Sequence, residues 1–112
     1  MNVQIYGRNK CFDTQKAERY FKERRIPYQR IDLDRFGLSK RELESVKAAT
    51  GLTALINAKS KEYTILNLQY IRSDEMKMEL LVNHPKLFAS PIVRNGKQAT
   101  VGFKPEIWKD WE

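Results

Sequence analysis

The sequence has one cysteine, Cys11, and one histidine, His84, which excludes two common ways of stabilising a small fold. A single cysteine cannot close an internal disulfide bond. One cysteine and one histidine are also too few ligands for a structural zinc site. We therefore expect a fold that needs neither an oxidising compartment nor a bound metal, and we expect a cytoplasmic protein.

Long apolar runs are also missing. No stretch of the 112 residues approaches the roughly 20 apolar residues that cross a bilayer. The first residues, Met1 to Tyr6, lack the basic start and apolar middle of a signal peptide. These absences predict a soluble protein with no membrane partner, and the length predicts one domain over residues 1–112.

Negative charge is scarce, because 21 Lys and Arg residues stand against 14 Asp and Glu, a formal net charge of +7. A positive field favours anionic partners such as nucleic acid, small oxyanions, acidic protein surfaces or the carboxylates of glutathione. The positive residues are interleaved with acids, and no nucleic-acid-binding motif is legible. We therefore expect no direct contact with nucleic acid, and a solvated basic surface is the simplest interpretation.

Hydrophobic spacing predicts two β-containing halves. A strand at 3–6, a helix at 13–25 and a strand at 28–33 form a right-handed parallel βαβ unit. Near the end, two strands at 92–94 and 97–101 flank Asn95–Gly96, which predicts a hairpin with a type I′ turn. A closing helix follows, with Ile107, Trp108 and Trp111 as its apolar stripe.

Between the halves, at about 36–88, the pattern predicts a helical insert. Ser39 and Glu42 fit a capping box at the start of its first long helix. The whole order predicts an α/β domain of the thioredoxin-like (glutaredoxin-like) class, a βαβ-ββα core with a helical insert.

Cys11 is the one strong candidate nucleophile, because this order places it where the first strand meets the first helix. A helix N-terminus offers unpaired N–H groups and partial positive charge, and Arg8 and Lys10 add cations nearby. Such settings lower a cysteine pKa from about 8.5 into a range of about 3.5–7.5. The alternative is a small buried apolar residue; the polar neighbours Lys10 and Asp13 favour the reactive thiol.

Five blocks of the sequence resemble the arsenate reductase family, which includes the Spx-type transcriptional regulators. The blocks are Tyr6–Thr14, Leu55–Tyr63, His84–Phe88, Ser90–Val93 and Val101–Phe103. The resemblance implies a thioredoxin-like fold with a helical insert. In the glutaredoxin-linked reductases the matching cysteine attacks arsenate, glutathione joins the adduct, and glutaredoxin releases arsenite.

Carried over, the resemblance makes Cys11 the nucleophile and the backbone N–H groups of Asp13 and Thr14 donors to its substrate. Pro91 matches the cis-proline that faces the cysteine. Lys59 and Ser90 stand where the family has arginines, and a lysine lacks the bidentate fork while a serine lacks the charge. These two departures predict inefficient arsenate reduction.

Two functions follow as hypotheses. The first is a thiol-dependent oxidoreductase without a bound cofactor, in which Cys11 attacks an oxyanion or a glutathione mixed disulfide and glutathione or glutaredoxin is the reductant. The alternative is an Spx-type regulator, or a non-catalytic module, that binds an RNA polymerase α subunit. Spx-type regulators usually carry a Cys-x-x-Cys switch, and Thr14 occupies its second position here.

Overall fold

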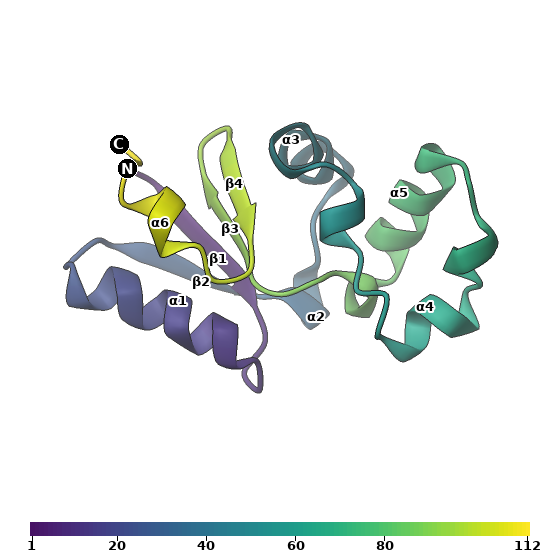
Figure 1. Cartoon of the computed structure of the whole chain (residues 1–112), viewed down its shortest axis with the longest axis horizontal. Coiled ribbons are helices and arrows are strands. Elements are labelled where there is room, and N and C mark those ends of the chain that lie inside the picture. Colours follow the sequence, from purple (N-terminus) through teal and green to yellow (C-terminus); the bar gives the residue numbers. More distant parts are fainter.

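The computed structural model describes all 112 residues and contains one four-stranded sheet with helices on both faces (Figure 1). The strands are β1 (Val3–Gly7), β2 (Tyr28–Asp32), β3 (Ile92–Asn95) and β4 (Gln98–Val101), in the order β2-β1-β3-β4. β1 is parallel to β2 and antiparallel to β3, which is antiparallel to β4. With α1 (Phe12–Glu23) and α6 (Pro105–Trp108), this is the thioredoxin-like fold that the sequence predicts.

A helical segment separates β2 from β3. Its elements are α2 (Leu33–Phe36), α3 (Lys40–Thr50), η1 (Thr53–Leu55), α4 (Lys61–Ile65), η2 (Leu68–Tyr70), α5 (Asp74–Asn83) and η3 (Pro85–Leu87). Figure 1 shows α4 and α5 at the end of the molecule opposite to α1 and α6. None of the helices has the length and apolar character needed to cross a membrane.

Alternation along the strands divides the core between the two faces of the sheet. Val3 and Ile5 of β1 join the side chains of α1 and α6 in one buried cluster, centred on Phe21 and Trp108. Tyr6 of β1 belongs to a second cluster, formed mainly with the helical segment. The insert therefore rests on one face of the sheet, while α1 and α6 cover the other.

Several predicted details differ from the structure. The helix predicted at 13–25 runs from Phe12 to Glu23, and the helical insert predicted at about 36–88 begins at Leu33. The strand predicted at 28–33 ends at Asp32, whose carboxylate accepts the N–H of Asp34 and caps α2. In the apolar stripe predicted for the last helix, Trp108 and Trp111 are buried but Ile107 is 44% exposed. The helix α6 is one turn long and therefore has room for only one buried large side chain of its own.

The predicted type I′ turn at Asn95–Gly96 is also wrong by one residue. Asn95 pairs with Gln98, so Gly96 and Lys97 form the loop. Only Gly96 has a positive φ, 62°, which fits a type II′ turn with glycine first. Asn95 is buried, and its side-chain amide is satisfied there because it accepts the N–H of Asn2 and donates to Gln98 and Glu112.

The predicted capping box does more than start α3. Ser39 and Glu42 exchange both hydrogen bonds, and the second oxygen of Glu42 accepts the Tyr6 hydroxyl at 2.7 Å. Arg94 lies 3.6 Å from the same carboxylate. Burial, followed by the hydrogen bond to Glu42, raises the pKa of Tyr6 to about 12. One carboxylate thus joins α3 to two strands of the sheet.

The end of β1 passes very close to the first turn of α1. A Cβ added at Gly7 would lie 2.4 Å from Cγ2 and 2.5 Å from Oγ1 of Thr14. Thr14 is completely buried, so it cannot move into solvent. Position 7 therefore requires glycine for lack of space. Backbone strain is not the reason, because the φ of Gly7 is not in the left-handed region.

We predict that Gly7→Ala destabilises the protein by about 1–3 kcal/mol, the usual cost of an added methyl group in a packed site. Urea denaturation of Gly7→Ala, Thr14→Ala and the double variant measures this. Because Thr14→Ala removes the two atoms closest to the new methyl group, the double variant should lose less stability than the sum of the single variants. Losses that add to within about 0.5 kcal/mol would contradict the contact.

Candidate active site

Cys11 lies at the junction that the sequence indicates, immediately before α1. Its backbone is extended, with φ −97° and ψ 115°, and it is the N-cap residue of the helix. Its N–H donates to the carbonyl of Arg8 at 3.2 Å, and its carbonyl accepts the N–H of Gln15 at 3.2 Å. These two bonds fix the half-buried thiol over the first turn of α1.

The loop before β3 faces the thiol from the other side. The Ser90–Pro91 peptide bond is cis, and Pro91 is buried. The neutral Cys11 thiol donates to the carbonyl oxygen of Ser90, with 3.8 Å between sulfur and oxygen. The hydroxyls of Ser90 and Thr14 lie 3.1 Å apart, and that of Thr14 also accepts the N–H of Arg8. Two hydroxyls therefore adjoin the sulfur.

These neighbours control the ionisation of Cys11. Burial opposes the charged form and so raises the pKa of the thiol. The hydroxyls of Ser90 and Thr14, followed by the backbone N–H groups of Thr14 and Asp13, all donate to a thiolate and outweigh that effect. The net result is a Cys11 pKa below that of an unperturbed cysteine. Uncharged donors, rather than cations, produce the shift.

Arg8, a candidate anion-binding residue, is held by other partners. Its Nε donates to the carboxylate of Asp34 at 2.7 Å. Its two terminal nitrogens donate to the carbonyl oxygens of Phe88 at 2.9 Å and Pro85 at 3.1 Å. The guanidinium therefore fastens the loop before Cys11 to the helical segment. Nothing in the sequence indicates these partners, because they lie 26 to 80 residues away.

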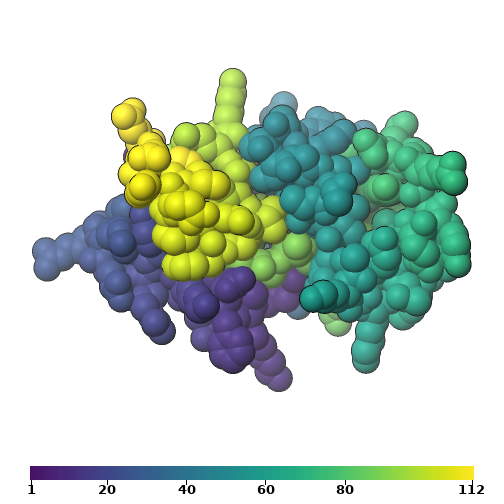
Figure 2. All heavy atoms as spheres, in the orientation of Figure 1, coloured from purple at the N-terminus to yellow at the C-terminus, as the bar shows by residue number.

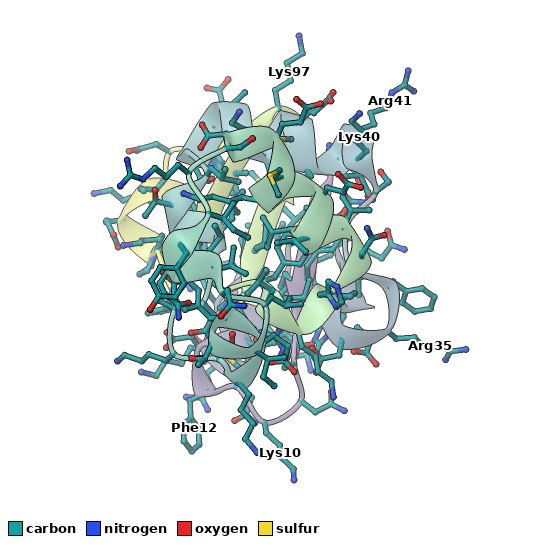
Figure 3. All side chains as sticks on the ribbon, turned by 90° about the vertical axis from the view of Figure 1, so that its right-hand side faces the viewer. Lys10, Phe12, Arg35, Lys40, Arg41 and Lys97 are labelled. Carbon is teal, nitrogen blue, oxygen red and sulfur yellow. The ribbon has the colours of Figure 1, made fainter.

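The two lysines of the predicted site are exposed. Lys10 and its neighbour Phe12 extend from the body of the protein into solvent at the same edge (Figure 3). Lys59 lies in the loop before α4, where its backbone N–H donates to the side chain of Asn57 at 3.0 Å. Of the predicted site residues, the structure thus brings Cys11, Asp13, Thr14, Ser90 and Pro91 together.

Two other arrangements are relevant to ligands. No group of three or more His, Cys, Asp or Glu side chains is placed to hold a metal ion. A surface groove of about 670 Å³ separates α3 from α5 and does not include Cys11. Its lining residues are Lys40, Glu44, Lys47, Glu75, Met78, Glu79, Val82 and Asn83.

The chain is similar over its whole length to regulators and reductases of one kind. The chain is 35% identical to the global transcriptional regulator Spx 2 of Oceanobacillus iheyensis, in an alignment of 128 positions that covers all of this chain and 94% of that protein. It resembles the structure of an arsenate reductase from Vibrio cholerae with a TM-score of 0.84 and 31% identity, covering 96% and 94% of the two chains. A putative ArsC family related protein from Bacteroides fragilis gives a TM-score of 0.86 at 26% identity, covering 97% and 96%.

The family profile decides the assignment. The profile of the ArsC family matches residues 6–111, which include Cys11, Pro91 and the whole helical segment. The match, the whole-length relatives and the thioredoxin-like topology agree with one another. This chain belongs to the ArsC family.

Proposed function

We propose that the protein is a monothiol oxidoreductase in which Cys11 takes glutathione from a mixed disulfide. The observation that carries the proposal is the surroundings of the sulfur: the backbone N–H groups at a helix N-terminus and the hydroxyls of Thr14 and Ser90. These groups lower the pKa of a thiol that is half-buried. A thiolate is the nucleophile in disulfide exchange, so this setting favours that reaction at neutral pH.

The exchange needs an external thiol to regenerate Cys11, because the chain has no second cysteine. The Cys11 thiolate attacks the glutathione sulfur of the mixed disulfide, a new S–S bond forms, and the substrate thiolate leaves and takes a proton from water. A second glutathione, or the thiol of a glutaredoxin, then attacks the Cys11 adduct and restores the Cys11 thiolate. The electrons thus come from that second thiol, which ends as a disulfide.

An oxyanion is a less suitable substrate for this site. Arsenate carries negative charge, and binding it beside a thiolate needs cations close to both. The guanidinium of Arg8 is held by Asp34 and two carbonyls, and Lys59 and Lys10 are exposed. Neutral donors dominate the surroundings of Cys11. We therefore favour disulfide exchange over arsenate reduction.

The first prediction concerns the thiolate. The rate of Cys11 alkylation by iodoacetamide, measured against pH on the folded protein, should have a midpoint below the value of a free cysteine, about 8.5. In Ser90→Ala the midpoint should rise, because the Ser90 hydroxyl is the strongest of the groups that lower the pKa. Ser45→Ala removes a hydroxyl from α3 as the matched control and should leave the midpoint unchanged. A midpoint at or above about 8.5 in the wild type would refute the activated thiol.

The second prediction concerns turnover. With glutathione and glutaredoxin present, the protein should reduce a glutathione mixed disulfide faster than it reduces arsenate in the same coupled assay. Cys11→Ser should lower both rates to those of glutathione and glutaredoxin without the protein, since an alcohol of ordinary pKa cannot replace the thiolate. A rate above that background in Cys11→Ser, or arsenate as the faster substrate, would count against the proposal.

A second candidate function is a regulatory binding module, favoured by whole-length similarity to a global transcriptional regulator. Family resemblance implies an RNA polymerase α subunit as its partner, with Gly51 and α3 near the contact. Gly51 ends α3 with a φ of +82°, and no atom lies within 4 Å of a Cβ built there, so this end of the helix is open.

We predict for this second candidate a complex with purified α subunit in size-exclusion chromatography that survives Cys11→Ser. Persistence is expected because a surface contact at α3 does not require the thiol. If no complex forms with either form of the protein, the regulatory function is excluded, and the thiol assay above remains an independent test of the first.

A further inference from the structure

Two exposed aromatic rings lie on the segments that form the Cys11 site. Phe12 follows Cys11 directly and is 78% exposed. Phe103 is 36% exposed and follows Gly102, whose N–H donates to the carbonyl of Pro91 at 2.8 Å. The Phe103 ring is fixed by an edge contact with Trp108, with centroids 5.6 Å apart. Thus one ring adjoins the nucleophile and the other adjoins the cis-proline loop.

Three lysines lie on the same segments as these rings. Lys16 follows Phe12 by one helical turn on the same face of α1, and its Nζ lies 5.9 Å from the centroid of Phe103. Lys10 and Lys104 are exposed beside the two rings in sequence. In the same segments the acids are Asp13 and Glu106, so cations are in excess, in a chain of net charge +7. The Phe12 surface, as we call it, consists of Lys10, Phe12, Lys16, Phe103 and Lys104.

This surface is open on one face of the molecule. Figure 2 shows the purple N-terminal segment projecting beside the yellow C-terminal segment, and Figure 3 shows Phe12 and Lys10 clear of the ribbon. An exposed phenyl ring costs free energy in water, and exposed apolar side chains with a polar rim are typical of interaction sites. The Phe12 ring contributes nothing to either buried cluster of the fold.

We propose that the Phe12 surface docks an acidic polypeptide segment with apolar side chains, and that the disulfide substrate of Cys11 is carried on such a segment. This inference rests on the proposed function and deepens it, because it assigns the substrate to proteins rather than to small disulfides. The choice of an acidic segment follows from charge complementarity with Lys10, Lys16 and Lys104, which steers association. Apolar side chains of the partner cover Phe12 and Phe103.

The chemistry on this surface is one disulfide exchange. The Cys11 thiolate attacks the glutathione sulfur on the docked segment, the bond between glutathione and the segment's cysteine breaks, and that cysteine leaves as a thiolate. The product is glutathionylated Cys11, and a further glutathione removes that group as glutathione disulfide. Docking brings the two sulfur atoms together and therefore raises the rate of the first step.

The experiment compares three substrates of the full-length protein. Two peptides of equal length each carry one cysteine as a glutathione mixed disulfide, flanked by glutamates and leucines in one and by lysines and glutamines in the other. Hydroxyethyl disulfide is the small uncharged reference. The release of thiol in a single exchange with Cys11 should be about tenfold faster for the acidic peptide than for the basic one at low salt. Added salt should reduce the difference.

Variants then separate docking from chemistry. Phe12→Ala should slow the acidic peptide about tenfold and leave hydroxyethyl disulfide within about twofold of the wild type. Tyr70→Ala, on η2 in the helical segment, removes a ring that is equally exposed and should change neither rate. Lys16→Glu should slow the acidic peptide and accelerate the basic one, which tests the charge complementarity separately from the ring.

Each result is decisive. Equal rates for the two peptides that are unaffected by Phe12→Ala, with an active reference reaction, would overturn the docking surface and leave the proposed function standing. A dimer in sedimentation that Phe12→Ala dissociates would overturn it too, because a second copy of the chain would then cover the ring. Failure of all three disulfides to react with Cys11 would refute the proposed function itself.

Discussion

The contact between Thr14 and Gly7 is the constraint on which the site depends. It joins the end of β1 to the first turn of α1 with no free space, since even one methyl group at position 7 would overlap the threonine. The buried Thr14 hydroxyl accepts the N–H of Arg8 and lies against the hydroxyl of Ser90. The end of β1, the first turn of α1 and the distant loop at Ser90 therefore meet at one side chain, and the thiol of Cys11 is positioned by all three.

The helical segment is connected to this site through Arg8. The guanidinium spans from the loop before Cys11 to Asp34 at the start of the segment and to two carbonyls at its end. The two bonds to the carbonyls are partly buried, and a hydrogen bond of a charged group in such a setting contributes about 1.5–3 kcal/mol. Within β1, Tyr6 is joined to α3 by the carboxylate of Glu42, which also lies beside Arg94. The segment is thus fastened to the sheet at two places, one of which adjoins Cys11.

Local patterns in the sequence predict the four strands, α1, α3 and α6 in their observed order, but not the short helices α2 and α4. Strand alternation and the capping box at Ser39 and Glu42 are short-range signals, and each corresponds to a feature of the structure. The errors occur where long-range contacts decide. Asn95 extends β3 rather than forming the turn because its buried amide binds both chain termini. No local pattern indicates that Arg8 binds carbonyls in η3 and beyond, or that Gly7 faces Thr14.

A hydroxyl at position 14 has a chemical consequence for the whole protein. In a site with two cysteines, the second thiol attacks the first adduct and releases it from within the chain. Thr14 cannot do this, because an alcohol forms no disulfide; it can only donate a hydrogen bond to the thiolate. In the proposed exchange the adduct on Cys11 therefore persists until an external thiol reaches the sulfur. That exchange consequently requires access from solvent, and a half-buried Cys11 between the exposed residues Lys10 and Phe12 meets the requirement.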